Sequence, residues 1–206
     1  MESAESNQRE FWNSRYESGR MPWDFGGVPA DLKAYLAANP KGGRVLIPGC
    51  GSGYEIAAFV EAGYEATAID LAPAAVERAR KLVDRGLADR IVEGDFFTHD
   101  LGREPFDLVY ERTFICSIMP DQREAYRDRV ASLLRHRGGL IGYFFYAPPD
   151  PAEGPPFGFA WGTADELFAR HFMLLKDRPV KDSLPLYAGR ERWQERTRTS
   201  QAVAGK

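Results

Sequence analysis

Three glycines and one aspartate form the clearest chemical pattern in the sequence. Gly49, Gly51 and Gly53 follow a short apolar run and are spaced G-x-G-x-G, unlike the G-x-G-x-x-G of dinucleotide-binding folds. Glycine lets the backbone turn tightly and approach a ligand at the start of the next helix. Asp70 ends the next predicted strand about 20 residues later, where a carboxylate can accept both hydroxyls of a ribose. The pattern predicts an adenosine-type cofactor; the alternatives are an ordinary glycine turn and an N-cap at Asp70.

Asp95 and Phe96 narrow the choice of cofactor. Asp95 ends the third predicted strand, where its carboxylate can accept from an adenine amino group while Phe96 covers the ring. S-adenosylmethionine enzymes of the doubly wound class need this contact, whereas NAD enzymes more often bind a pyrophosphate. A turn aspartate is the alternative for Asp95. The fourth strand is followed by "YERTFICSI" and not by the Asn/Asp-Pro-Pro-aromatic motif of adenine amino methylases, so a nucleic-acid base is not expected as acceptor.

The elements that must position these residues alternate along the chain. Strands are predicted at 44–49, 65–70, 90–95, 106–111, from Gly138, at 172–180 and at 191–199, and helices from Pro29, Tyr54 and Pro73 and at 120–136 and 163–171. This alternation predicts βαβ units and an α/β fold with a parallel sheet buried on both faces. The Pro- and Gly-rich segment 148–159 is predicted to be a loop over the carboxyl edge of that sheet.

Length and charge limit the class of protein. A chain of 206 residues suits one domain, and we expect a single domain over 1–206, with 1–40 as an N-terminal lid segment and helix and 41–206 as the core. The 27 basic and 30 acidic residues include no run of like charge that would indicate a nucleic-acid or membrane surface. Without an apolar leader or a stretch of about 18 apolar residues, a cytoplasmic protein is expected.

Cysteine and histidine give no metal pattern. Cys50 and Cys116 belong to no C-x-x-C pair, so reduced thiols are expected, and Cys116 is interpreted as a buried, inert thiol. His99, His136 and His171 are isolated in the sequence and lack ligand spacing. No metal is therefore expected.

The chain resembles the thiopurine S-methyltransferase family, and within it the halide/thiol methyltransferase branch, from about Phe11 to Arg198. The resemblance rests on "FWNSRY…PWD", "LIPGCGSGYE", "AID", "GDFF", "FDLVYERTFICSIMPDQREAY" and "GPPF". It implies a class I methyltransferase fold, which is a doubly wound, Rossmann-like, mostly parallel sheet of seven strands with the last strand antiparallel. It also implies S-adenosylmethionine as cofactor and S-adenosylhomocysteine as product.

The resemblance further implies a set of cofactor-binding residues. They are Trp12, Trp23, Gly49, Gly51, Gly53, Asp70, Leu71, Asp95 and Phe96. An indole face beside a sulfonium gains about 0.5 to 2 kcal/mol of cation–π attraction. Alternatively, the two tryptophans staple the helix near Pro29 to the core.

Methyl transfer from a sulfonium is an in-line displacement, with reacting atoms about 3 to 3.5 Å apart. A halide, thiocyanate, hydrosulfide or thiolate already carries its lone pair, so no strong general base is required, and none is obvious in the sequence. The protein must instead supply a small, dry, mildly electropositive pocket, because dehydration makes these anions more reactive.

Two arginines are candidates for the acceptor site. Arg123 falls on the predicted inward face of its helix, in the first turn, where the macrodipole disfavours a cation. Its partner is either a nearby carboxylate or a ligand, and the resemblance implies the active site, because thiopurine methyltransferases have an arginine at the matching place. Arg112 follows the fourth strand and also matches an arginine of those enzymes, where plant halide methyltransferases have an aromatic residue. It can alternatively pair with Glu111.

Tyr146 and Phe157 complete the predicted acceptor site. Tyr146 matches a tyrosine of the halide/thiol branch and either directs its hydroxyl at a bound anion or makes a hydrogen bond within the core. Phe157 either lines the apolar side of the site or anchors its loop.

The sequence thus predicts a monomeric S-adenosylmethionine-dependent methyltransferase that acts on a small soft nucleophile, either a thiol, hydrosulfide, thiocyanate or halide. A larger aromatic thiol, such as a thiopurine, or a secondary metabolite is the alternative acceptor. A non-catalytic cofactor-binding protein on the same fold and an NAD-dependent oxidoreductase are the alternatives of other classes.

Overall fold

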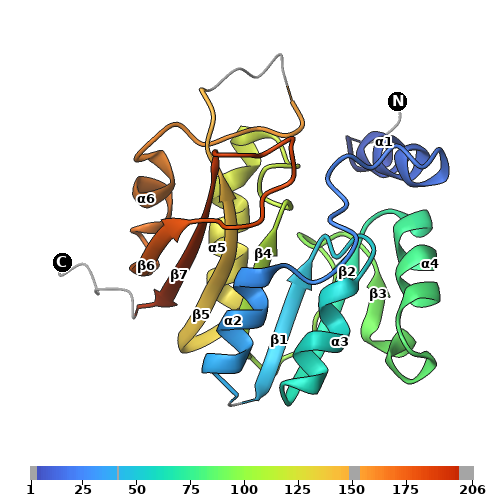
Figure 1. Ribbon diagram of the computed structural model, residues 1–206, viewed down its shortest axis with the longest axis horizontal. Helices are drawn as coiled ribbons and strands as arrows, with labels where there is room; N and C mark the ends of the chain where they lie inside the picture. The colour runs from blue at the N-terminus through green and yellow to red at the C-terminus, as the bar shows by residue number, and fades with distance from the viewer. Residues whose placement is uncertain (1–3, 41, 149–153, 200–206) are drawn as a thin grey trace.

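A seven-stranded sheet with the spatial order β3-β2-β1-β4-β5-β7-β6 forms the centre of the protein (Figure 1). The computed structural model describes residues 4–40, 42–148 and 154–199. The strands are β1 (Gly43–Pro48), β2 (Tyr64–Asp70), β3 (Ile91–Glu93), β4 (Phe106–Arg112), β5 (Leu134–Phe145), β6 (Phe172–Pro179) and β7 (Glu191–Arg198). Strands β1 to β5 pair in parallel, and β7 is antiparallel to both of its neighbours. The predicted mostly parallel sheet with an antiparallel last strand is therefore confirmed.

Helices cover both faces of the sheet. One face carries α2 (Ala30–Ala38), α3 (Tyr54–Glu61) and α4 (Pro73–Leu82), and the other carries α5 (Arg123–Leu133) and α6 (Thr163–Phe168). Because successive strand residues point to opposite faces, Val45 packs into the first layer and Leu46 into the second. The central strands are thus buried on both sides, which explains their continuous apolar runs.

Helix α1 (Ala4–Glu17) lies near the carboxyl ends of the strands, against α4 (Figure 1). The Asn13 side-chain oxygen accepts from the Ala74 backbone N–H at 2.8 Å, in the first turn of α4. An ion pair joins Arg9 to Glu93 at the end of β3. The N-terminal segment is therefore anchored to the sheet edge where the glycine loop lies. None of the helices within the described ranges is long and apolar enough to cross a membrane.

Several boundaries differ from the prediction. The helix expected over 120–136 is a 3₁₀ turn η2 (Pro120–Gln122) followed by α5, and β5 already begins at Leu134. The register of β5 on β4 jumps from Phe106↔Leu134 to Leu108↔Gly139, and Arg137 has φ of 61°, so the residues between them form an irregular strand start. Burial of Leu134 in the core draws this segment onto the sheet.

Other differences concern lengths. Helix α6 ends before the predicted 171, and β3 occupies only the middle of the predicted 90–95; it is preceded by a 3₁₀ helix η1 (Arg85–Arg90) that was not predicted. Of the predicted loop 148–159, residues 149–153 lie outside the described residues. Residues 154–159 lie along the carboxyl edge of the sheet, as predicted, and Phe159 forms a bridge with Tyr146.

Candidate active site

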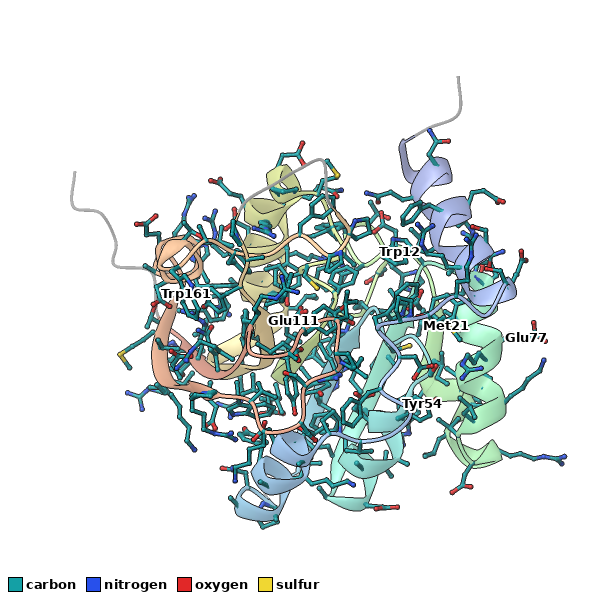
Figure 2. All side chains as sticks on the ribbon, turned by 45° about the horizontal axis from the view of Figure 1, so that its top comes forward. Trp12, Met21, Tyr54, Glu77, Glu111 and Trp161 are labelled. Atoms are coloured by element: carbon teal, nitrogen blue, oxygen red, sulfur yellow. The ribbon has the colours of Figure 1, made fainter. Side chains whose placement is uncertain are left out.

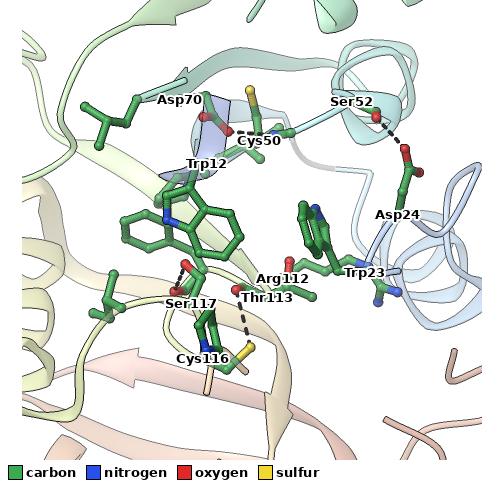
Figure 3. Close-up of a pocket in the computed structure, with 18 of the residues that line it drawn as sticks. Trp12, Trp23, Asp24, Cys50, Ser52, Asp70, Arg112, Thr113, Cys116 and Ser117 are labelled. Atoms are coloured by element: carbon green, nitrogen blue, oxygen red, sulfur yellow. Dashed lines mark hydrogen bonds between the residues drawn. The ribbon is translucent and has the colours of Figure 1, made fainter. Parts of the chain in front are cut away.

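A cavity of about 430 Å³ opens at the carboxyl ends of the central strands (Figure 3). Its walls come from α1 and the segment after it, the loops after β1, β2 and β3, the turn after β4, and the loops 154–159 and 181–190. In this topology β1 and β4 are neighbours whose connections leave in opposite directions, which is where open α/β sheets bind ligands. The volume lies in the range of small-molecule sites.

The glycine loop lines the cavity with its backbone. Gly49 and Gly51 have φ of 57° and 52°, a region that favours glycine. A Cβ at Gly51 would lie 2.7 Å from the Tyr16 hydroxyl, and one at Gly49 would lie 2.4 Å from the Phe114 ring. Gly53 does not line the cavity; it precedes α3, and a Cβ there would lie 3.0 Å from that of Ala79 in α4. Two of the three predicted glycines therefore form the cradle, and the third packs behind it.

Asp70 is held by the backbone of the loops beside it. Its carboxylate accepts from the Gly51 N–H at 2.9 Å and from the Ala72 N–H at 3.0 Å. Burial raises the pKa of Asp70, and the backbone donors of Ala72, Gly51 and Leu71 oppose that rise. Both Asp70 and Leu71 line the cavity, as predicted. The carboxylate thus shapes the glycine loop and also faces the ligand space.

Asp95 both closes a turn and lines the cavity, so the two roles that the sequence left open do not exclude each other. One carboxylate oxygen accepts from the Phe97 N–H at 2.9 Å and closes a turn after β3. Asp95 also lines the cavity, together with Phe96 and Phe97. Phe96 is only 3 % exposed and packs against Phe114. An aromatic wall therefore stands beside the carboxylate.

Trp12 and Trp23 both project into the cavity (Figure 3). Their rings meet edge to face with centroids 5.3 Å apart. The indole N–H of Trp23 donates to the Tyr16 hydroxyl at 3.3 Å, and burial raises the pKa of Tyr16. Tyr16 was not predicted, although it lies one helical turn after Trp12, a spacing that places both on one face of α1.

Asp24 fastens the segment after α1 to the glycine loop. Its carboxylate accepts from the Ser52 hydroxyl at 2.6 Å and from the Arg78 guanidinium at 3.3 Å (Figure 3). Sequence reasoning missed this aspartate, because nothing in the sequence indicates that it meets a residue of the glycine loop and one of α4 so far along the chain. The segment that carries Trp12 and Trp23 is thereby held to α4 by Asn13 and to the glycine loop by Asp24.

Arg112 lines the cavity as a buried cation. It is 8 % exposed, and its guanidinium lies 4.4 Å from the ring centroid of Tyr143 and 4.8 Å from that of Phe25. Neither terminal nitrogen has a hydrogen-bond partner within the described part of the chain. Burial disfavours its charge, but Tyr110, Glu55 and Glu191 outweigh that effect and raise the pKa of Arg112. The alternative pairing with Glu111 is not made.

Glu111 instead faces the opposite side of the sheet and holds the turn after β4. One carboxylate oxygen accepts from the N–H groups of Phe114 and Ile115, both at 2.9 Å, and the other accepts from the Tyr126 hydroxyl at 2.6 Å. Burial raises the pKa of Glu111 to about 7, although these donors oppose the rise. This buried carboxylate positions the turn that carries Arg112 and Phe114.

Three predicted acceptor residues do not line the cavity. Arg123 donates to the carbonyl oxygens of Phe157 and Gly158 at 2.5 and 3.2 Å, so it fastens the loop 154–159. Phe157 is buried in that loop. Among the described residues these carbonyl oxygens take the place of the nearby carboxylate that the sequence left open as a partner.

Tyr146 points away from the cavity. Its hydroxyl accepts from the Gln194 amide at 2.8 Å, and its ring stacks on Trp161 with centroids 4.6 Å apart. Figure 2 shows Trp161 well apart from Trp12. The structure therefore has the hydrogen bond within the core, which is one of the two alternatives that the sequence left open.

The cavity wall on this side comes from residues that the sequence analysis did not assign to the acceptor site. They are Pro155, Pro156, Leu186, Tyr187, Cys116 and Ser117. Cys50 and Cys116 are buried free thiols, and burial raises the pKa of both. Within the described ranges, no group of three or more His, Cys, Asp or Glu residues has the arrangement of a metal site.

The cavity fits S-adenosylmethionine. Gly49 and Gly51 line the cavity without side chains, so a ligand can approach their backbone closely. Asp70, Leu71, Asp95 and Phe96 line the adjacent wall, at the ends of β2 and β3. This is the order of groups that a ribose and an adenine require.

Comparisons with known proteins agree with this geometry. Residues 7–199 match the model of the thiopurine S-methyltransferase family. "Probable thiol methyltransferase 2" of Arabidopsis thaliana is 33% identical over 150 residues, which cover 70% of this chain and 65% of that protein, slightly less than two thirds of its length. "Thiocyanate methyltransferase 1" of Brassica oleracea is 29% identical over 160 residues, covering 76% and 70% of the two chains.

A solved structure shares the fold. The 1,6-didemethyltoxoflavin-N1-methyltransferase of Burkholderia thailandensis, solved with 1,6-didemethyltoxoflavin and S-adenosylhomocysteine, has a TM-score of 0.73 and 24% identity, covering 93% of this chain and 87% of that one. With the family match over residues 7–199, the chain belongs to the thiopurine S-methyltransferase family of S-adenosylmethionine-dependent methyltransferases.

Proposed function

We propose that this methyltransferase methylates a small soft nucleophile, a thiol or hydrosulfide-type acceptor, bound next to Arg112. The observation that carries the proposal is the Arg112 guanidinium, which faces the cavity between two aromatic rings with both terminal nitrogens unpartnered in the described part of the chain. Buried donors without partners are rare, and a ligand that accepts from them recovers their desolvation cost. An electron-rich sulfur or anion meets that requirement.

Residues at the ends of β1, β2 and β3 would hold the cofactor. Gly49 and Gly51 open the backbone to it, Asp70 accepts from the ribose, and Asp95 with Phe96 takes the adenine. When bound, S-adenosylmethionine supplies an electrophilic methyl group on a positively charged sulfur.

Trp12 and Trp23 would cover the reacting end of the cofactor. Their rings line the cavity from the side of α1, and an indole face favours a nearby cation. The hydrogen bond from Ser52 to Asp24 holds the two tryptophans in place, so they would exclude water from the site.

Cavity size supports a small acceptor. The cofactor and the acceptor share about 430 Å³, and sites for one drug-sized ligand already occupy about 300 to 1,000 Å³. Pro155, Pro156 and Tyr187 close the acceptor side. A thiopurine would require these residues to move outward.

Methyl transfer to a panel of acceptors tests the proposal. The purified protein is incubated with S-adenosylmethionine and iodide, thiocyanate, hydrosulfide, thiophenol or a thiopurine, and the methylated products are measured by mass spectrometry. Turnover of hydrosulfide or thiophenol above that of the thiopurine is expected. Preference for the thiopurine contradicts the small-acceptor assignment, and no product with any acceptor contradicts the proposed function.

A further inference from the structure

Several buried polar groups gather around Arg112 on one face of the sheet. Arg112 in β4 is in register with Tyr143 in β5, and Phe145, two residues further along, is in register with Glu191 in β7. Side-chain atoms here are buried without a hydrogen-bond partner in the described ranges: Arg112 Nη1 and Nη2, the Tyr143 hydroxyl and Glu191 Oε2. Native proteins rarely leave so many polar atoms unsatisfied in one place. Folding alone therefore does not explain why these unpartnered polar atoms lie together.

Glu55 belongs to this cluster and also faces the cavity. It is in the first turn of α3, two residues after Gly53, and its side chain is 7 % exposed. Both Glu55 and Arg112 line the cavity, yet no ion pair joins the two. A buried carboxylate and a buried guanidinium thus line the same cavity without forming an ion pair with each other.

The surroundings of Glu55 make it a base. Burial raises its pKa, whereas the charge of Arg112 and the neighbouring Tyr110 hydroxyl lower it, and Asp24 raises it. Cys50 is the remaining titratable neighbour on the side of the glycine loop. A carboxylate with a raised pKa takes a proton from a thiol more readily than an ordinary glutamate does.

We propose that Glu55 is the proton acceptor for an uncharged thiol bound beside Arg112. The thiol S–H bond breaks, the proton moves to the Glu55 carboxylate, and the electron pair stays on the sulfur, facing the Arg112 guanidinium. This inference rests on the proposed function and names its substrate class: thiols, including hydrogen sulfide, that enter in the protonated form.

Charge in the cavity favours such a substrate over a halide. The positive charge of Arg112 is opposed by Glu55 and Glu191, both of which act on it from nearby. An iodide ion that enters as an anion therefore meets a cation that is already compensated. A neutral thiol enters without that penalty and becomes charged only after Glu55 has taken its proton.

Glu55→Gln separates the two kinds of acceptor. The variant keeps the side-chain volume but cannot take a proton, so kcat/KM for 2-mercaptoethanol is expected to fall by about 10²- to 10⁴-fold. Iodide needs no base, and kcat/KM for iodide is expected to stay the same or rise, because Arg112 loses a compensating charge. Glu61→Gln, at the exposed end of the same helix, is the matched control and should leave both values unchanged. An equal fall for both acceptors, or no fall for the thiol, overturns the proposal.

A binding measurement tests Glu55 without turnover. 2-Mercaptoethanol, an aliphatic thiol that is protonated in neutral buffer, is added to the protein saturated with S-adenosylhomocysteine, and thiolate absorbance is recorded together with calorimetry in two buffers of different ionisation enthalpy. The wild-type protein should bind thiolate and release no proton to the buffer, because Glu55 keeps it. Glu55→Gln should either lose the thiolate band or release about one proton per thiolate formed.

The outcomes distinguish this inference from the function on which it rests. If Glu55→Gln matches the wild type in both thiolate absorbance and proton count, the proposal is wrong. If Glu191→Gln changes them instead, the proton acceptor is Glu191 and the proposal is also wrong. Failure of the wild-type protein to methylate any acceptor contradicts the proposed function, whereas the binding measurement still decides the role of Glu55.

Discussion

The loops after β1, β2 and β3 and those after β4, β5 and β6 form two sides of one cavity and satisfy their polar groups differently. On the first side, Asp70 and Asp95 accept from backbone N–H groups in or next to their own loops. On the second side, Arg112, Tyr143 and Glu191 keep buried atoms without partners in the described part of the chain. The proposed cofactor side is therefore organised by its own backbone, whereas, among the described residues, Arg112 leaves hydrogen-bond donors free at the proposed acceptor side.

The largest effect is expected from removing the carboxylate that organises the cofactor side. Asp70→Ala leaves the N–H groups of Gly51 and Ala72 unpaired and removes the group that faces the ribose. Hydrogen bonds to a charged group contribute about 1.5 to 3 kcal/mol each, so the Kd for S-adenosylmethionine should rise by about 100-fold or more. Calorimetric titration measures it, and Glu65→Gln, exposed on the same strand, is the control. A change of less than about threefold would show that the loop holds its shape without Asp70.

The second prediction concerns Glu111, which supports the acceptor side from beneath. Its pKa is about 7 in the folded protein and 4.5 without the fold, so the folded state binds more protons between these values. The contribution of Glu111 to stability is therefore complete below pH 4.5 and is lost as the pH rises through 7. The free energy of unfolding of the wild type minus that of Glu111→Gln should fall by about 3 kcal/mol between these limits.

Denaturant unfolding of both proteins at a series of pH values measures this difference, because titrations common to both cancel. Glutamine can still accept from Phe114 and Ile115, so the variant should fold. Glu166→Gln, which changes an exposed carboxylate in α6, is the control for the substitution itself. A flat difference for Glu111→Gln would mean that the buried carboxylate titrates normally.

The third prediction separates the two sides of the cavity. Arg112→Met keeps much of the side-chain length but removes the unpartnered charge. Charged hydrogen bonds to the acceptor are worth about 1.5 to 3 kcal/mol, so kcat/KM for a thiol should fall by about 10- to 100-fold. The Kd for S-adenosylmethionine should stay within about twofold, because Arg112 faces the acceptor side. The exposed Arg85→Met is the control, and an equal loss of cofactor affinity would contradict the division into two sides.

The same division explains which residues the sequence could predict. The glycine loop, Asp70, Leu71, Asp95 and Phe96 each end or directly follow a predicted strand, and their places depend on local backbone geometry. Local patterns therefore carry most of the cofactor side, whereas the seven-stranded fold with its antiparallel last strand was implied by the family resemblance.

The acceptor side depends on contacts between distant segments. Glu55 looks like an ordinary helix-terminal carboxylate until α3 is packed behind β4, and Glu191 joins it only through the pairing of β7 with β5. Glu111 and Arg112 are adjacent in sequence but face opposite sides of the sheet, so a residue's place after a strand does not say which face it serves. The sequence pattern does not give the pairing register of the strands, and that register decides which face of the sheet each residue occupies.

Tyr146→Phe should have the smallest effect, and it tests whether a residue at the end of a strand faces the cavity or the core. The sequence left two roles open for this hydroxyl, at a bound anion or in a hydrogen bond within the core, and in the structure it accepts from Gln194 while its ring stacks on Trp161. Loss of that hydrogen bond should cost about 1 kcal/mol of unfolding free energy, while kcat/KM for iodide and for a thiol should stay within about twofold. Unfolding and kinetic assays on one preparation measure both. A tenfold loss of activity with iodide alone would mean that Tyr146 turns into the cavity when an anion binds, and the boundary between the two sides would then include the end of β5.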